Sequence, residues 1–261
     1  MKNTIIILSL ICATINSKAQ SKHILFMMSA ANELPLMNGK TYTNTGVFLS
    51  EFYLAYYDLK ERGYQITFTT PKGIPSKIDK ESFDKKYWSG RDSLLKQAIQ
   101  FIETDSGFKH PIPLEDALKQ VDLYAGIIVP GGQGLMVDLI KDTLTQKIIM
   151  LFAEKQKCVG LICHAPALLT TFTANNNPFK GYKVNSVTGI EELFIEQVVM
   201  KGKPYNRKIG KQLKRLGYIY LKSRPAKNYA IRDRNLVTSQ NPFSNEAFCR
   251  LFIEALNLYN K

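Results

Sequence analysis

Cysteine and histidine are scarce in this sequence, which has four Cys and three His among 261 residues. One cysteine, Cys12, lies in an apolar N-terminal stretch. The other three are Cys158, Cys163 and Cys249. An odd number without paired spacing argues against a disulfide framework. The histidines are His23, His110 and His164. So few histidines argue against a His-rich metal site, and we expect the protein to use neither a metal nor a cofactor.

Two other features are missing. The sequence has no Walker-type Gly-Lys-Ser/Thr ending and no G-x-G-x-x-G spacing, which disfavours nucleotide binding. No apolar run is long enough to span a membrane, and the run over residues 4–15 is typical of a signal peptide. The positive charge of Lys2 and the small residues Ser17 and Ala19 place this signal at 1–19, with one domain at 20–261. We therefore expect a periplasmic or secreted protein without an integral membrane segment.

Acidic residues are outnumbered, with 22 Asp and Glu against 35 Lys and Arg, for a formal net charge of +13. Much of the excess lies in residues 201–227, which contain no acid. No nucleic-acid recognition motif accompanies this charge, so we expect no nucleic-acid partner. A solvated basic face, open to anionic lipid or envelope polymer, is the preferred interpretation.

Strand and helix patterns alternate along the chain. Apolar runs that suit buried strands cover residues 22–29, 64–70, 123–129, 158–162 and 182–187, with shorter strands expected at 218–222, 229–232 and 235–238. Helical patterns cover residues 46–62, 114–120, 138–155 and 245–258. The alternation predicts an α/β fold with a doubly wound, mostly parallel sheet. The irregular segment 74–113, which holds the only tryptophan, is expected to form a small cap or insertion.

A cysteine lies at the predicted turn between the apolar run 158–162 and the next helix. Cys163 and His164 occupy this turn, and Pro166 follows in the first helical turn. Backbone N–H groups and the positive end of a helix favour a thiolate, which would make Cys163 a nucleophile. A buried structural cysteine is the alternative interpretation.

Two other segments are expected near this turn, because ligands of such sheets bind at the carboxyl ends of the strands. Pro130-Gly131-Gly132-Gln133-Gly134 follows a strand, and its backbone N–H groups could face an oxyanion or cradle a phosphate. Residues 188–192 follow another strand. Glu51 lies on or beside the apolar face of the helix 46–62, which is unusual for a carboxylate, although an exposed surface Glu is the simpler interpretation.

Together, Glu51, P-G-G-Q-G at 130–134, G-L-I-C-H-A-P at 160–166 and S-Q-N-P-F-S at 239–244 resemble the ThiJ/PfpI superfamily. This group has a flavodoxin-like fold and is related to the class I glutamine amidotransferase domain. The early helix with G-V-F-L-S-E and the long segment between 72 and 114 are most similar to its heat-shock chaperone and glyoxalase III branch.

The resemblance implies roles for particular residues. Cys163 would be the nucleophile, His164 its acid/base partner, and Glu51 a protonated or proton-shuttling carboxyl near the sulfur. Gly131 and Gly132, with the backbone N–H of His164, would form the oxyanion and substrate-binding site. A homodimer is a further expectation from the resemblance.

The chain also departs from its relatives. They usually read G-G-H-G where this chain has Gln133. Where some relatives place an Asp that orients the His, this chain has residues 188–192, so Glu191 or Glu192 is the candidate for that role. A glutaminase triad is disfavoured because no histidine follows His164.

The function expected from the resemblance is a cofactor-independent cysteine enzyme acting on small reactive carbonyls. It would convert methylglyoxal to lactate, as glyoxalase III does, or remove early glycation adducts as a protein deglycase. Two alternatives remain open at this stage: a stress-related holdase chaperone with a redox-sensitive cysteine, and a cysteine peptidase or amidase.

Overall fold

A seven-stranded sheet forms the centre of the protein in a computed structural model that describes residues 21–173 and 175–259. The predicted signal peptide, 1–19, lies outside the described residues. The strand order is β10-β11-β7-β6-β1-β4-β5, and only β10 runs antiparallel to its neighbour. Its strands are β1 (His23–Met27), β4 (Gln65–Thr70), β5 (Ile112–Pro113), β6 (Gly126–Val129), β7 (Cys158–Ile162), β10 (Ala230–Asp233) and β11 (Leu236–Ser239). The predicted doubly wound, mostly parallel α/β fold is confirmed.

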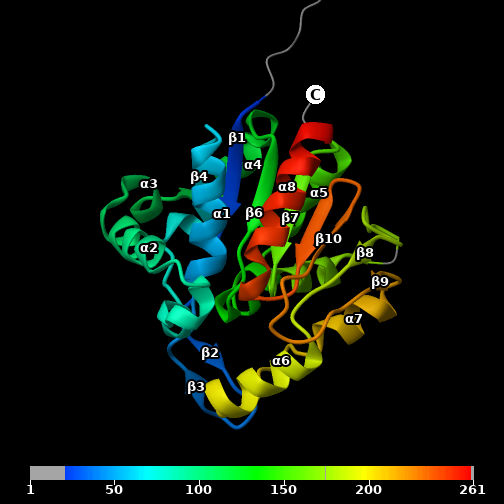
Figure 1. Cartoon of the computed structure of the whole chain (residues 1–261). Coiled ribbons are helices and arrows are strands. Elements are labelled where there is room, and N and C mark those ends of the chain that lie inside the picture. Colours follow the sequence, from blue (N-terminus) through cyan, green and yellow to red (C-terminus); the bar gives the residue numbers. More distant parts are fainter. Residues whose placement is uncertain (1–20, 174, 260–261) are drawn as a thin grey trace, which may run out of the picture.

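Helices cover both faces of this sheet (Figure 1). In that view α1 and α8 lie in front of the sheet, and α4 and α5 lie behind it. The helices are α1 (Leu49–Glu61), α2 (Asp92–Thr104), α3 (Ser106–Lys109), α4 (Leu114–Lys119), α5 (Thr143–Glu154), α6 (Gly189–Phe194), α7 (Ile209–Arg215) and α8 (Asn245–Tyr259). Because helices cover both faces of the sheet, the central strands are apolar along their whole length, as is usual for parallel strands. Within the described parts of the chain, no helix has the length and apolar character needed to cross a bilayer.

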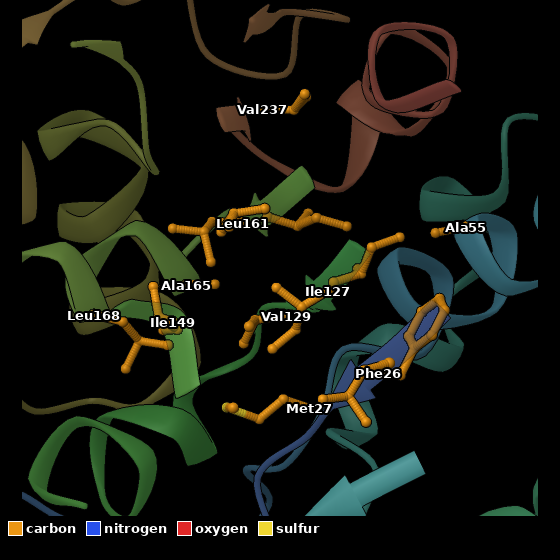
Figure 2. Packing of buried hydrophobic residues seen from close by; sticks show 14 of the residues in the cluster. Phe26, Met27, Ala55, Ile127, Val129, Ile149, Leu161, Ala165, Leu168 and Val237 are labelled. Atoms are coloured by element: carbon orange, nitrogen blue, oxygen red, sulfur yellow. The ribbon is translucent and has the colours of Figure 1, made fainter. Parts of the chain in front are cut away.

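The core is continuous across neighbouring strands. Figure 2 shows Phe26 of β1, Ile127 of β6, Leu161 of β7 and Ala55 of α1 within one cluster, and all four side chains are buried. In register, Phe26 pairs with Ile128 on one side and with Phe68 on the other. This dense packing fixes where each strand ends, and therefore where the loops at the carboxyl ends lie.

Two predicted strands, those at 182–187 and 218–222, do not join the main sheet. Of residues 182–187, only Lys183–Val184 form a strand, β8, which pairs with β9 (Ile219–Tyr220) in a separate two-stranded sheet. The reason is that β11 occupies the free side of β7, with Leu236 opposite Val159. The prediction of a main-sheet strand at 182–187 was therefore wrong. A second small pair, β2 (Leu34–Pro35) and β3 (Thr41–Tyr42), lies below the sheet near α6 in Figure 1.

The segment 74–113 packs into the same core as the sheet. Trp88 is fully buried, and its indole N–H donates to the carbonyl oxygen of Ser82 over 3.0 Å. The segment contains α2 and α3 and ends in β5, whose Ile112 pairs with Thr69 of β4. It therefore contributes both a covering layer and the edge of the sheet.

Candidate active site

The turn after β7 holds Cys163 in a strained conformation, with a φ of 59°. Positive φ is uncommon for a residue other than glycine, and strain of this kind is concentrated at functional sites. Two backbone hydrogen bonds fix the turn: Cys163 donates to Ser239 over 2.9 Å, and Val187 donates to the Cys163 carbonyl over 2.9 Å. The Cys163 side chain therefore takes its position from the pairing of β7 with β11.

His164 lies directly beside the thiol. Its Nδ1 is 3.3 Å from Sγ of Cys163, and its Nε2 is 3.1 Å from Nε2 of Gln133. With the Gln133 amide N–H donating, the ring proton sits on Nδ1, facing the sulfur. With the amide turned over, the proton sits on Nε2, and Nδ1 is free to accept. Gln133 therefore selects the tautomer of His164.

Glu51 reaches the other side of the sulfur from the first turn of α1. It is fully buried, and a Cβ atom on Gly131 would lie 2.4 Å from its Oε2 and 2.8 Å from Cβ of Cys163. Only glycine at 131 therefore allows the carboxyl and the thiol to come this close. Glu51 therefore lies close to Cys163, as the resemblance implied. The alternative interpretation of Glu51 as an exposed surface residue is wrong.

The surroundings of Glu51 favour its protonated form. Burial raises the pKa of Glu51 to about 8, against the lowering effect of the Cys163 thiol and the Gly131 N–H. Among the described residues, its carboxyl oxygens make no hydrogen bond of ordinary geometry to a nitrogen or oxygen atom. A protonated carboxyl can then donate to the sulfur.

The electrostatics of Cys163 differ from the sequence-based expectation of a stabilised thiolate. Burial raises the pKa of the Cys163 thiol well above its usual value, and the Glu51 carboxyl adds to this effect. The segment that follows, Ala165–Thr171, is a short 3-10 helix and not the expected α-helix. The stabilisation that its N-terminus can give to a thiolate is therefore smaller than expected. Burial also lowers the pKa of His164 to about 4, which keeps the imidazole neutral. The resting site thus has a thiol with a neutral acceptor beside it.

Gly132 supplies a free backbone donor. Its φ is 105°, and a Cβ atom there would lie 2.1 Å from the Gly46 carbonyl oxygen, so glycine is required for this close approach. Gly132 lines the cavity above Cys163, and within residues 21–173 and 175–259 no protein acceptor takes its N–H. Such a donor suits an oxyanion that forms near Sγ.

Neither candidate glutamate orients His164. Glu191 lines the cavity, but its carboxylate accepts from Thr188 in the capping box of α6, from Asn241 over 2.8 Å and from the Ala226 N–H over 3.0 Å. Both ring nitrogens of His164 have other partners.

Glu192 accepts instead from the backbone N–H of Lys208 over 2.9 Å. Its carboxylate is committed to the start of α7. Glu191 therefore connects the loops around the cavity, and Glu192 stabilises the start of α7. Of the residues considered, Gln133 is the one that contacts His164 and can orient it.

Asp79 is a cavity residue that sequence reasoning did not find. It is buried, burial raises its pKa to about 7, and its side chain caps the short helix that starts at Lys80. A capping pattern is readable from the sequence, but its place is set by the pairing of Val47 with Ile78, which only the fold reveals.

The cavity above Cys163 has a volume of about 480 Å³. One wall is aromatic, with ring centroids of Phe48 and Tyr87 4.9 Å apart and those of Tyr87 and Phe243 5.5 Å apart. The opposite wall comes from α6 and the turn after it, including Ile190 and Phe194. In the described parts of the chain, no three His, Cys, Asp or Glu side chains are grouped so that they could hold a metal ion.

Comparison with known proteins assigns the chain to a family. Residues 43–255 match the DJ-1/PfpI family. The chain belongs to the DJ-1/PfpI family. The protein/nucleic acid deglycase HchA of Escherichia coli O1:K1 is 24% identical over 236 residues, which cover 89% of this chain and 80% of that protein. The predicted superfamily is confirmed.

Solved structures show the same fold. Glyoxalase III from Candida albicans superposes with a TM-score of 0.72 at 24% identity, covering 89% of this chain and 96% of that one. The 24 kDa Rapid Encystment Protein of Francisella tularensis gives a TM-score of 0.73 at 21% identity, with 90% and 98% covered.

In this DJ-1/PfpI protein, Gln133→Glu is expected to raise the pKa of His164 by about 1–2 units, because a carboxylate at Nε2 favours the charged ring. The measurement is an NMR titration, which three histidines keep simple. Gln100→Glu adds the same charge on the exposed side of α2 and should leave His164 unchanged. An unshifted His164 in Gln133→Glu would contradict the contact.

Proposed function

We propose that this protein converts small α-oxo aldehydes such as methylglyoxal to 2-hydroxy acids, without glutathione or a cofactor. The observation that carries the proposal is the position of the Cys163 thiol, between the protonated carboxyl of Glu51 and the neutral ring of His164, at the base of a cavity. The relatives named glyoxalase III and deglycase support it. The same chemistry extends to early glycation adducts, which present a similar carbon to the sulfur.

The first step forms a carbon–sulfur bond. With the Gln133 amide turned so that its oxygen accepts from Nε2–H of His164, Nδ1 is unprotonated and 3.3 Å from the sulfur. Sγ of Cys163 then adds to the aldehyde carbon as its proton passes to Nδ1 of the neutral ring. The former aldehyde oxygen gains negative charge and is met by the N–H of Gly132. Because the thiol is protonated at rest, it loses its proton during the attack, and no thiolate is needed beforehand.

The second step moves hydrogen between carbons. The aldehyde carbon loses its proton and is oxidised to a thioester, while the neighbouring ketone carbon takes up the electron pair and a proton and becomes a carbinol. Glu51 and His164 flank the sulfur and act as the acid and base. Water then cleaves the thioester and releases the 2-hydroxy acid with the thiol restored. The substrate is oxidised and reduced within itself, so no external oxidant is needed.

The test is lactate formation from methylglyoxal by the wild-type protein in the absence of glutathione. Lactate that accumulates in proportion to the protein concentration supports the proposal. If no lactate forms while the protein is folded and its thiol is reduced, the proposal fails.

A holdase chaperone is a second candidate, and exposed apolar side chains favour it. Ile190, Phe194 and Val198 are each more than half exposed along one segment, and Tyr205 is 71% exposed. Runs of this kind mark interaction surfaces. The holdase function predicts that suppression of client aggregation survives Cys163→Ala. Aggregation that proceeds unchanged in the presence of the protein would reject it.

A further inference from the structure

The cavity is far larger than methylglyoxal needs. Its volume of about 480 Å³ lies in the range of sites that take drug-sized ligands. Besides Cys163, its lining includes the aromatic wall of Phe48, Tyr87 and Phe243 and the apolar side chains of Ile190 and Phe194. A substrate with only a methyl group would touch few of these side chains.

Several polar groups on the walls are hydrogen-bonded to one another. The Tyr87 hydroxyl donates to Glu81 over 2.9 Å, and Asp79 accepts from the Glu81 N–H over 3.0 Å. The Asn241 amide donates to Glu191, and its oxygen accepts from the Phe243 N–H over 3.0 Å. Hydroxyl groups of a sugar-like substrate would therefore find few unengaged partners here, and burying them unpaired is costly.

The rings themselves face the cavity. The Tyr87 hydroxyl is hydrogen-bonded to Glu81, and the Tyr87 ring lies between those of Phe48 and Phe243. Phe194, from the opposite wall, is 55% exposed, so its ring is not committed to the core. Aromatic groups favour offset or edge contacts with such rings.

We propose that the preferred substrates are α-oxo aldehydes with an aromatic or branched apolar group on the ketone carbon, and that Phe194 is a specificity-determining residue for that group. This inference rests on the proposed function. The aldehyde end meets Cys163, and the apolar group lies between Phe194 and the aromatic wall. Conversion gives the corresponding 2-hydroxy acid by the same internal oxidation and reduction, with water as the only co-reactant.

The experiment compares kcat/KM for phenylglyoxal and methylglyoxal in three proteins: wild type, Phe194→Ala and Leu193→Ala. Leu193 is the matched control, since it neighbours Phe194 on α6, is 44% exposed, and does not line the cavity. The wild type should prefer phenylglyoxal by about tenfold or more. Phe194→Ala should lower this preference severalfold, and Leu193→Ala should keep it. The ratio cancels general effects of folding and of the chemical step.

The failures are distinguishable. If methylglyoxal is turned over and phenylglyoxal is not preferred, or if the preference is the same in Phe194→Ala as in the wild type, the inference fails and the proposed function stands. If neither aldehyde is turned over, the proposed function fails and the inference falls with it.

Discussion

Cys163→Ala is expected to lower methylglyoxal turnover by roughly a thousandfold or more, since Cys163 supplies the thiol that lines the cavity. The other two cysteines of the described residues offer no substitute. Cys158 is buried within β7, and burial raises the pKa of Cys249, on α8, to about 12. The measurement is kcat/KM for methylglyoxal, with a thermal unfolding curve to show that the variant is folded.

Cys249→Ala is the matched control for this experiment. Cys249 lies on α8, packs beside the core and does not line the cavity. Its loss should change kcat/KM by no more than about twofold, because substitutions away from a site have small effects. Turnover that survives in Cys163→Ala would overturn the nucleophile assignment, and with it the proposed function.

Glu51→Gln is expected to have two opposite effects, a loss of activity and a gain in stability. The amide cannot give or take the proton that the reaction moves, which should lower kcat by about 10²–10⁴-fold. The stability effect follows from burial. The pKa of Glu51 is about 8 in the folded protein and near 4.5 when the chain is unfolded. As pH rises from 4.5 to 8, the unfolded chain releases this proton and the folded chain retains it, so the free energy of unfolding falls.

A glutamine at 51 removes that pH dependence. We expect the variant to be more stable than the wild type by about 3 kcal/mol at pH 7, with the difference vanishing near pH 4. Thermal unfolding of both proteins between pH 4 and pH 8 measures it. Glu61→Gln, at the exposed end of the same helix, is the control and should follow the wild type at every pH. A stability difference that stays constant with pH would show that Glu51 is not held protonated by the fold.

Local pattern was enough for much of this protein. The apolar runs of β1, β6 and β7 predicted a parallel sheet, because strands buried on both faces need apolar residues throughout. The turn at Cys163 and the glycines at 131 and 132 stand where those runs end, so the sequence placed them at one edge of the sheet. The unusual position of Glu51 among aromatic residues drew attention to it, and the family resemblance implied its place near the sulfur. Export through residues 1–19 and a homodimer both stay predictions.

Long-range pairing decided the rest. Residues 182–187 read as a buried strand, but β11 reaches β7 from far along the chain and takes that side of the sheet. Glu191 and Glu192 looked equivalent as partners for His164, yet the capping box of α6 turns one toward Asn241 and the other toward Lys208.

Charge states are the clearest case of what only the tertiary structure determines. The sequence predicted a stabilised thiolate at Cys163 from its place before a helix. Folding instead surrounds Cys163, His164 and Glu51 with protein, and burial favours the neutral form of all three. Residue identity and spacing, together with the family resemblance, predicted which groups meet at this site. The exclusion of water, which depends on every element packed around them, decided which of those groups hold a proton.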